Sequence, residues 1–448
     1  MDIQGKNITI LGLGESGFSS AKLAKHKGAN VFVSEKSAKN KSNEYINIFN
    51  ELGIEYEIGK HSSKVYYSNI WIISPGISKN DKIIKDALNA KIEIYGEIEF
   101  ASWFTKSFII AITGSNGKTT TSNIINSMLI KSNHLPILAG NIGIPFSEMV
   151  LNELVNNKKN IIYVLEISSF QMEFIKFFRP DIGIYLNISQ DHLDRHFTMS
   201  EYIKLKLSMV SNQIKDDIIV YNYDDKILKK SFQNTHKKAI PFSIKKDIFN
   251  YSLKNNKISN KKNGFLIECS DIGILGQHNY SNILASLNAI DFLHIENKIL
   301  INALKEIKPI EHRLELIKTK NYINFINDSK ATNIEAVIAA IKTFNGPMIL
   351  LLGGRNKGSN FQYLLPFLTK NIKLIIAFGE SANEIATQIR DAVRLEVSTS
   401  LEDAVVLAHK LASFGDVVLL SPGCASFDEF IDYKERGFKF KSIVKELK

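Results

Sequence analysis

The stretch AITGSNGKTT, residues 111–120, decides how the rest of the chain is interpreted. It follows the apolar run SFIIAITG and precedes the helix-like run TTTSNIINSMLI, which predicts a strand, a glycine loop and a helix. Backbone N–H groups at such a helix start can hold phosphate, Lys118 can reach the terminal phosphates, and a hydroxyl such as that of Thr119 can bind Mg²⁺. The Walker pattern has a glycine six residues before the lysine, where this chain has Ile112. The loop is therefore a short form, G-x-x-G-K-T.

Two later strand ends offer partners for this loop. The run VLEISSFQME supplies Glu166, an acid in the position where a phosphate loop needs a metal ligand, which favours Mg²⁺. In NISQDHLDRHF, His192 lies beside Asp191 and Asp194. A histidine among carboxylates is often a hydrogen-bonded structural group, and Mg²⁺ prefers oxygen ligands, so residue chemistry alone leaves a metal role for His192 open.

Composition narrows the class of protein. The chain has 448 residues, 44% hydrophobic and 23% charged, which is ordinary globular composition for two to four domains. Two cysteines give no disulfide framework, and neither a signal peptide nor a membrane span is visible. The net charge of +10 does not predict nucleic-acid binding, because the densest lysine stretch, residues 245–265, has little aromatic interleaving and resembles a solvated segment of short strands and turns. Attraction of a phosphate-bearing substrate explains part of the charge equally well.

The N-terminal segment begins with a second glycine motif. In NITILGLGESG an apolar strand runs into G-x-G-x-x-G, and a second strand, ANVFVSE, ends at Glu35, where a ribose-binding acid is expected. The pattern permits a dinucleotide, another nucleotide, or a strand-to-helix turn without a ligand. No hydride-transfer site follows, which disfavours a dehydrogenase.

The whole chain alternates strands and helices and predicts an α/β fold of three domains, 1–96, 97–309 and 310–448. The outer two are expected to be Rossmann-like, and the central one a P-loop ATPase domain with a mostly parallel sheet. In the third, NDSKATN, GGRNKGSNF and SPGCASFDEF each follow an apolar run. Ligands bind beyond the carboxyl ends of parallel strands, and Lys330 and Lys357 in these loops suggest an anionic partner such as a carboxylate.

Several of these motifs together resemble a known family. TGSNGKTT, LEISSFQ, DHLDRH, GQHNYSNILAS, EHR, NDSKATN and SPGCASFDEF occur in the order seen in the Mur ligases, which build the peptide of peptidoglycan with ATP. The resemblance covers essentially the whole chain, and the short phosphate loop is the form found in this family. GLGESG and LLSPGCASFDEFIDYKERG are most similar to the branch of the family that adds D-glutamate.

The resemblance implies a role for particular residues. ATP would be bound by Gly114, Ser115, Asn116, Gly117, Lys118, Thr119, Thr120, Asn279, Asn282, Arg313, Asp328 and Lys330. UDP-N-acetylmuramoyl-L-alanine would be bound by Gly14, Glu15, Ser16, Glu35, Asn141, Ser168 and Gln171, and D-glutamate by Thr332, Lys357, Ser426 and Tyr433. Two Mg²⁺ ions would be held by Thr119, Glu166, His192 and Lys206, with Lys206 carrying CO₂ as a carbamate. The catalytic residues would be Lys118, Glu166, His192 and Lys206.

The implied reaction joins D-glutamate to UDP-N-acetylmuramoyl-L-alanine through an acyl phosphate, in a cytoplasmic monomer that neither binds nucleic acid nor inserts into membranes. The chain departs from the family's usual pattern at Glu35-Lys36-Ser37, often Asp-Thr-Arg, and at Tyr433, often Phe, which affects the expected contacts to uracil and to D-glutamate. Two rivals remain: a sibling ligase, which SPGCASFDEF disfavours, and a non-catalytic ATP-dependent switch, which would not need the third-domain loops.

Overall fold

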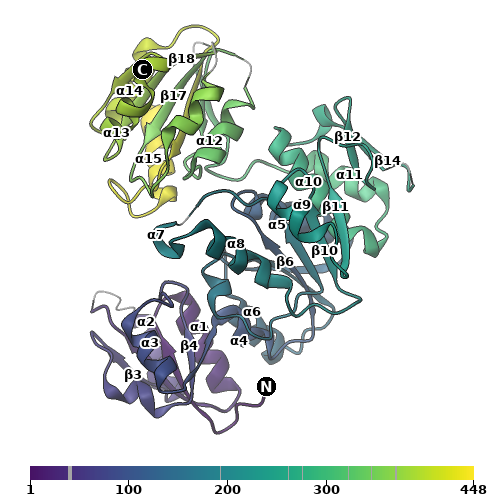
Figure 1. Ribbon diagram of the computed structural model, residues 1–448, viewed down its shortest axis with the longest axis vertical. Coiled ribbons are helices and arrows are strands. Elements are labelled where there is room, and N and C mark those ends of the chain that lie inside the picture. The colour runs from purple at the N-terminus through teal and green to yellow at the C-terminus, as the bar shows by residue number, and fades with distance from the viewer. Residues whose placement is uncertain are drawn as a thin grey trace.

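The computed structural model describes residues 1–38, 43–191, 193–260, 262–274, 276–320, 322–344, 346–368 and 371–447. Its three lobes follow one another along the chain, with the N-terminus in the lowest lobe of Figure 1 and the C-terminus in the uppermost. Each lobe is built around a sheet whose strands are almost all parallel. The α/β prediction is therefore confirmed, with helices covering sheet faces because continuous apolar strands must be buried on both sides.

The N-terminal lobe contains a five-stranded parallel sheet in the order β3-β2-β1-β4-β5. Its strands and helices are β1 Asn7–Leu11, α1 Glu15–His26, β2 Asn30–Glu35, α2 Asn43–Leu52, β3 Glu55–Ile58, β4 Ile70–Ile73, α3 Lys82–Asn89, β5 Glu93–Gly96 and α4 Glu97–Ser102. The strand order reverses at β1, so the turn from β1 to α1 lies at the edge where ligands of such sheets bind.

The central lobe contains a six-stranded parallel sheet in the order β11-β10-β9-β6-β8-β7 and a small antiparallel sheet, β12-β13-β14. The strands are β6 Phe108–Thr113, β7 Leu135–Gly140, β8 Ile161–Glu166, β9 Ile182–Tyr185, β10 Ile218–Asn222, β11 Lys238–Phe242, β12 Ser252–Lys254, β13 Lys257–Asn260 and β14 Phe265–Glu268. The helices are α5 Lys118–Lys131, α6 Phe146–Val155, α7 Leu193–His196, α8 Met199–Leu207, α9 Lys226–Phe232, α10 Gln277–Ile290 and α11 Asn297–Glu306. Because β6 lies between β8 and β9, the phosphate loop after β6 faces the ends of both neighbours.

The C-terminal lobe contains a sheet in the order β15-β16-β20-β17-β18-β19, in which only the edge strand β15 is antiparallel to its neighbour. Its elements are β15 Glu315–Lys320, β16 Ile323–Asn327, α12 Ile334–Ile341, β17 Met348–Gly353, β18 Ile372–Phe378, α13 Ala382–Ile389, β19 Leu395–Val397, α14 Leu401–Leu411, β20 Val417–Gly423 and α15 Tyr433–Glu446. The loops NDSKATN and SPGCASFDEF leave the adjacent strands β16 and β20 at the same edge.

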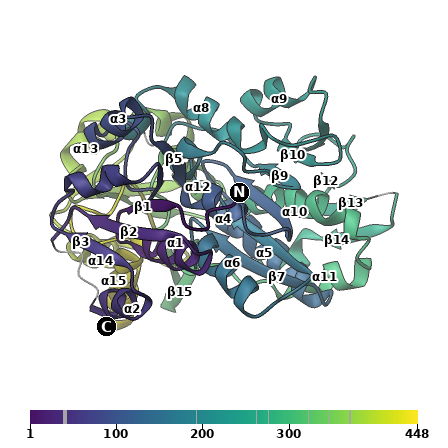
Figure 2. The same cartoon turned by 90° about the horizontal axis from the view of Figure 1, so that it is seen from below.

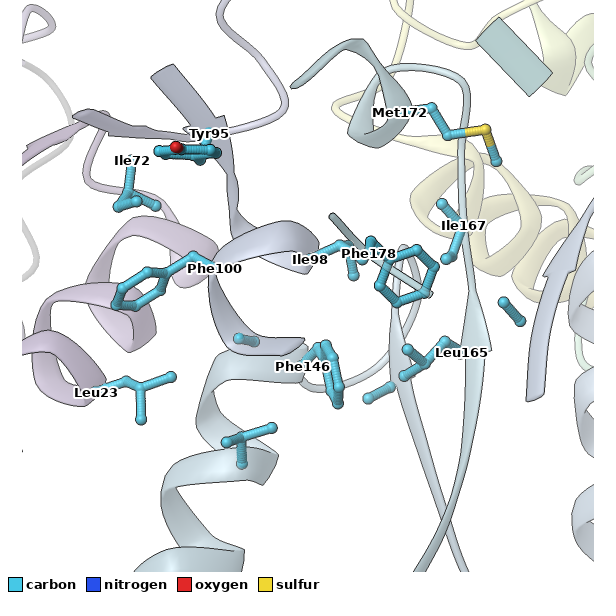
Figure 3. Close-up of a cluster of buried hydrophobic side chains, with 14 of the residues drawn as sticks. Leu23, Ile72, Tyr95, Ile98, Phe100, Phe146, Leu165, Ile167, Met172 and Phe178 are labelled. Atoms are coloured by element: carbon cyan, nitrogen blue, oxygen red, sulfur yellow. The ribbon is translucent and has the colours of Figure 1, made fainter. Parts of the chain in front are cut away.

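The first two lobes share one hydrophobic core. Leu23 of α1 and Phe100 of α4 belong to the same buried cluster as Phe146, Leu165 and Phe178 of the central lobe, as Figure 3 shows. Helix α1 lies beside α6 at this junction (Figure 2). The clusters of the C-terminal lobe, in contrast, take their described residues only from residue 314 onward. The third lobe is therefore joined to the rest by the linker and by polar contacts.

A buried carboxylate stabilises the junction between the first two lobes. Glu99 of α4 is fully buried, and its Oε2 accepts the backbone N–H groups of Lys176, Phe177 and Phe178 at 2.8–2.9 Å. Across the described chain, every helix is too short or too polar to span a membrane.

Candidate active site

The phosphate loop forms at the start of α5, as the sequence predicts. Gly117 has φ of +89°, and a Cβ at this position would lie 2.5 Å from Oδ1 of Asn282, so only glycine fits. Lys118 is folded back, with Nζ donating to the carbonyl oxygens of Gly114 at 2.7 Å and Ser115 at 3.1 Å. Burial lowers the pKa of Lys118. An anion in the loop would give this ammonium a stronger acceptor than the neutral carbonyls it now contacts.

Oxygen ligands gather at the end of β8. The hydroxyl of Thr119 donates to Oε2 of Glu166 at 2.8 Å, and Asn141 donates to Oε1 of the same carboxylate at 3.0 Å. Nζ of Lys330, from the C-terminal lobe, donates to Oγ1 of Thr119 at 2.8 Å. Burial, reinforced by Arg313, lowers the pKa of Lys330 to about 7. A hydroxyl and a carboxylate fit Mg²⁺, which usually takes one or two carboxylates and completes its shell with water and phosphate oxygens.

Lys206 lies directly behind the loop. It is 2% exposed, its Nζ is 3.1 Å from the carbonyl oxygen of Gly114, and the ammonium lies 4.8 Å from the ring centre of Tyr202. Burial, together with the neighbouring Lys118, holds the pKa of Lys206 well below its usual range. The neutral amine is the form that reacts with CO₂, so this environment suits the carbamate that the resemblance implies.

His192 lies outside the described residues, so its predicted metal role stays a prediction. The preceding residue, Asp191, lines the cleft beside Glu166. Among the described residues, no group of three or more His, Cys, Asp or Glu side chains is arranged to hold a metal ion.

The C-terminal lobe contacts the phosphate loop through hydrogen bonds. The side-chain amides of Asn116 and Asn333 donate to each other at 3.2 and 3.3 Å.

Arg313 lies between two residues with left-handed backbone, His312 at φ 62° and Leu314 at φ 45°. Such conformations cost free energy in residues with side chains, so the surrounding contacts must hold this segment in place.

Asp328 helps to hold that segment. Its Oδ1 accepts the N–H of Leu314 at 3.3 Å, and its Oδ2 accepts the hydroxyl of Ser421 at 2.9 Å. Burial raises the pKa of Asp328 to about 7, against the lowering effect of Arg313. Asp328 therefore holds the linker segment in place, and its predicted contact with ATP stays a prediction.

All three lobes contribute to one cleft of about 520 Å³. Among the residues predicted to be functional, it is lined by Glu15, Ser115, Asn116, Gly117, Lys118, Thr119, Asn141, Glu166, Ser168, Arg313, Lys330, Thr332 and Tyr433. A cleft of this size can hold the reacting groups of several substrates together.

A second cavity, of about 390 Å³, opens on the other side of the loop. Asn116, Gly117, Asn282, Arg313 and Asp328, five of the residues predicted to bind ATP, line it. Two others, Thr120 and Asn279, line a more apolar cavity of about 300 Å³ that Arg313 also borders. Asn279 and Asn282, three residues apart on α10, share one face of the helix, because Nδ2 of Asn282 donates to Oδ1 of Asn279 at 3.4 Å, and they line neighbouring cavities.

The N-terminal glycine turn begins α1. Gly14 precedes the helix, Glu15 reaches the shared cleft and Ser16 is partly exposed beside it. Glu35 ends β2 and is 8% exposed, with its two oxygens accepting the N–H groups of Leu13 at 2.7 Å and Ser37 at 2.6 Å. Glu35 therefore holds the turn.

The other residues predicted to bind the UDP substrate lie near the end of β8. Ser168 donates from both its N–H and its hydroxyl to Oε1 of Gln171, at 3.0 Å each. Gln171 is buried, and Ser168 lines the cleft near Asn141. Of the residues predicted to bind the UDP substrate, Glu15, Asn141 and Ser168 line the cleft in the described structure, whereas Gly14, Ser16, Glu35 and Gln171 do not.

The predicted D-glutamate residues are divided. Thr332 and Tyr433 line the shared cleft, and Lys330 stands 5.5 Å from the ring centre of Tyr433. Ser426 is 2% exposed and Lys357 is partly exposed, and in the described structure neither lines that cleft.

Three residues outside the predicted set support the site. Asn187, two residues after the end of β9, accepts the N–H of Asn116 at 2.8 Å and donates to its carbonyl at 3.0 Å. The hydroxyl of Tyr202 lies 3.0 Å from Oγ of Ser115. Both could be found from sequence, because Asn187 ends an apolar strand and Tyr202 is one helical turn from Lys206.

The third, Arg436 of α15, gives no such signal. It is completely buried and donates to the carbonyl oxygens of Ser329 at 2.9 Å and Cys424 at 3.1 Å. It thereby joins the loop after β16 to the loop after β20. Its only sequence context is an amphipathic helix, in which an arginine usually faces solvent.

Family models match the three lobes in order. The description "Mur ligase MurD-like, N-terminal domain" matches residues 6–96, "Mur ligase middle domain" 112–290, and "Mur ligase, glutamate ligase domain" 312–424. A UDP-N-acetylmuramoylalanine--D-glutamate ligase from Pelodictyon phaeoclathratiforme is 35% identical, covering 100% of this chain and 99% of the relative. Another with the same name from Christiangramia forsetii is 37% identical, covering 99% and 100%.

The fold is also similar to that of a solved Mur ligase. The crystal structure of MurF ligase from Thermotoga maritima in complex with ADP matches with a TM-score of 0.64 and 18% identity, covering 100% of this chain and 97% of that one. Full-length similarity above 30%, three family models in sequence, and a phosphate loop at the meeting point of three lobes agree: the chain belongs to the Mur ligase family.

Proposed function

We propose that this enzyme joins the amine of D-glutamate to the terminal carboxylate of UDP-N-acetylmuramoyl-L-alanine, with conversion of ATP to ADP and phosphate, in peptidoglycan precursor synthesis. The observation that carries the proposal is the cleft itself. The loop with Lys118, the N-terminal turn with Glu15 and the C-terminal loop with Thr332 meet there. The names of the full-length relatives supply the identity of the substrates.

The proposed reaction must first activate the substrate carboxylate, because oxide is a poor leaving group. A carboxylate cannot expel oxide, so its oxygen first attacks the γ-phosphorus of ATP, which releases ADP and forms an acyl phosphate. The amine of D-glutamate then attacks the carbonyl carbon, and phosphate leaves the tetrahedral intermediate. Lys118 would offset the charge of the approaching anions and of the transferring phosphoryl group. Closure of the third lobe would exclude water from the acyl phosphate.

The proposed role of each residue follows from its position around the cleft. Thr119 and Glu166 would hold one Mg²⁺, and His192 with a carbamylated Lys206 would hold a second. These ions would supply further positive charge for the phosphoryl transfer. The polyphosphate would lie in the loop with Arg313, Asp328 and Lys330 around it, while the nucleoside would lie in the cavity against Asn282.

The remaining assignments are also part of the proposal. The domains would be 1–96 for the UDP substrate, 97–309 for ATP and 310–448 for the amino acid. The UDP substrate would be bound by Gly14, Glu15, Ser16, Glu35, Asn141, Ser168 and Gln171, and D-glutamate by Thr332, Lys357, Ser426 and Tyr433. The enzyme would act as a cytoplasmic monomer without nucleic acid or membrane insertion.

A panel of substrates tests the function. Phosphate release from ATP should require both UDP-N-acetylmuramoyl-L-alanine and D-glutamate, and mass spectrometry should find the product heavier by one glutamyl residue. L-glutamate, L-alanine, a diamino acid and a dipeptide serve as controls in place of D-glutamate. Preference for one of these controls would point to a sibling ligase, and ATP hydrolysis without either substrate would favour the switch.

The position of Lys357 outside the cleft leads to a separate expectation. If the third lobe closes to bring Lys357 to the amino acid, Lys357→Ala should raise the KM for D-glutamate at least tenfold, as loss of a charged hydrogen-bond partner costs about 1.5–3 kcal/mol. The KM for ATP should change little. Steady-state kinetics with each substrate varied in turn decide this. Lys373→Ala is a matched control, because Lys373 is paired with Asp416 elsewhere in the same lobe. An unchanged KM for D-glutamate would make Lys357 a solvated charge.

A further inference from the structure

The segment from residue 222 to residue 262 contains most of the unbalanced charge of the protein. It has eleven lysines and three aspartates, whereas the whole chain has a formal net charge of +10. It runs from the end of β10 through α9 and the edge strand β11 into the small antiparallel sheet, and the short strands predicted for residues 245–265 lie in its second half and just beyond. Attraction of a phosphate-bearing substrate explains part of this charge, but none of these lysines has a role in the proposed reaction.

The three aspartates are already engaged by the fold. Asp224 accepts the hydroxyl of Ser243 at 2.7 Å and the N–H of Ile244 at 2.9 Å. Asp225 caps α9 by accepting its first backbone N–H groups at 2.9 and 3.0 Å. Asp247 is paired with Lys254 at 2.7 Å. Lys257 pairs with Glu268 just beyond the segment, and among the described residues the other lysines apart from Lys254 form no ion pair.

The turn after β11 is fixed and directs two adjacent lysines apart. The buried hydroxyl of Ser243 accepts the N–H groups of Lys245 at 3.0 Å and Lys246 at 2.9 Å. The Lys246 ammonium stands 5.0 Å from the ring centre of Tyr223, which Lys229 approaches to 4.5 Å. Lys246 is thus held on the outer face of the turn.

Lys245 instead lines the cavity of about 390 Å³ on the nucleotide side of the phosphate loop, together with Ile244. Strand β11, which leads into this turn, packs against α10, the helix that carries Asn282 (Figure 1). Within the described chain, no ion pair involves the exposed Lys245. The other charged side chains on the cavity wall are Arg313, Asp328, Glu335 and Lys342.

We propose that Lys245 is a further nucleotide-binding residue, which donates to an oxygen or ring nitrogen of bound ATP or ADP while Ile244 forms an apolar wall beside the nucleoside. The inference rests on the placement of the nucleoside in this cavity under the proposed function. An ammonium has three donors and ATP offers ribose, base and phosphate acceptors, so the contact needs no special geometry. The other lysines of residues 222–262 add to the positive charge of the same segment.

Direct binding of Mg²⁺–ADP to the full-length protein, measured by calorimetry, tests the assignment without requiring ligation. Lys245→Met keeps the apolar stem and removes the charge, and Lys246→Met does the same one residue away on the outer face. Loss of one charged hydrogen bond should weaken ADP binding by Lys245→Met about tenfold. Lys246→Met should stay within about twofold of the unaltered protein, because a solvated charge contributes little. Unchanged unfolding midpoints establish that both variants are folded.

Repeating the titrations at low and high ionic strength separates a contact from a general field. A Lys245-specific loss that persists at high salt supports the assignment. Equal losses in both variants that vanish at high salt would overturn it in favour of the field of the whole lysine cluster. No loss in either variant would also overturn it. If the unaltered protein binds ADP but ligates nothing, the proposed function fails while the role of Lys245 is still measured.

Discussion

Replacement of Lys118 by alanine is expected to abolish turnover, with a loss of roughly 10³-fold or more, comparable to or larger than the loss of one preorganised group in a transition state. Among the described residues, Nζ of Lys118 donates to two neutral carbonyl oxygens, so its charge is available for the phosphates. The stability of the fold should change little, because the side chain ends in the cleft rather than in a hydrophobic cluster. A phosphate-release assay combined with thermal unfolding measures both effects.

Lys131 provides the matched control for this substitution. It closes the same helix, α5, and pairs on the surface with Glu306 at 2.6 Å. Lys131→Ala should therefore retain activity, since exposed ion pairs contribute about 0–1 kcal/mol. Near-normal ligation by folded Lys118→Ala would contradict the assignment of the phosphate loop.

The second large effect is expected at Lys206. Lys206→Ala should lose most activity because the second metal would lose an anionic oxygen ligand, the kind that Mg²⁺ prefers. Lys206→Arg should fail as well, because a guanidinium keeps the positive charge and cannot form a carbamate. Lys204→Ala should stay active, since Lys204 lies exposed on the same helix, α8.

Carbon-13 NMR of the unaltered enzyme with labelled bicarbonate should detect the carbamate directly, and removal of bicarbonate should lower activity. Thermal unfolding of each variant distinguishes a lost ligand from a damaged interior, since Lys206 is buried. A fully active sample whose Lys206 carries no adduct would contradict the proposal, as would an active Lys206→Arg enzyme.

The sequence predicts the interior of each sheet better than its edges. Strands such as β6, β8, β17 and β20 are continuous apolar runs because both of their faces are covered. The edge strands β3, β5, β7 and β19 have short, polar or proline-containing sequences, and no pattern predicts them. An edge strand buries less apolar surface, so its sequence is less constrained. The interior strand β10 is also an apolar run, but it is not among the predicted strands.

The candidate site likewise has parts that the sequence predicts and parts that it does not. Motifs at strand ends predict the loop and its carboxylate, because local sequence determines where a strand stops and a helix begins. Contacts between lobes depend on the relative position of distant segments, which no local pattern contains. The pairing of Asn116 with Asn333, the brace formed by Arg436 and the separation of Lys357 from Thr332 are of this kind.

The shared core of the first two lobes has a consequence for the order in which the protein can fold during synthesis. All strands of the first two lobes, and the helices α10 and α11 that cover the central sheet, precede residue 307. At about 5–20 residues per second, the remaining residues take roughly 7–28 seconds to translate, which is long compared with the folding of most domains. The nascent chain can therefore complete the phosphate loop while its third lobe is still being made. Until Asn333 and Lys330 emerge from the ribosome, the loop would face solvent without its partners from the third lobe.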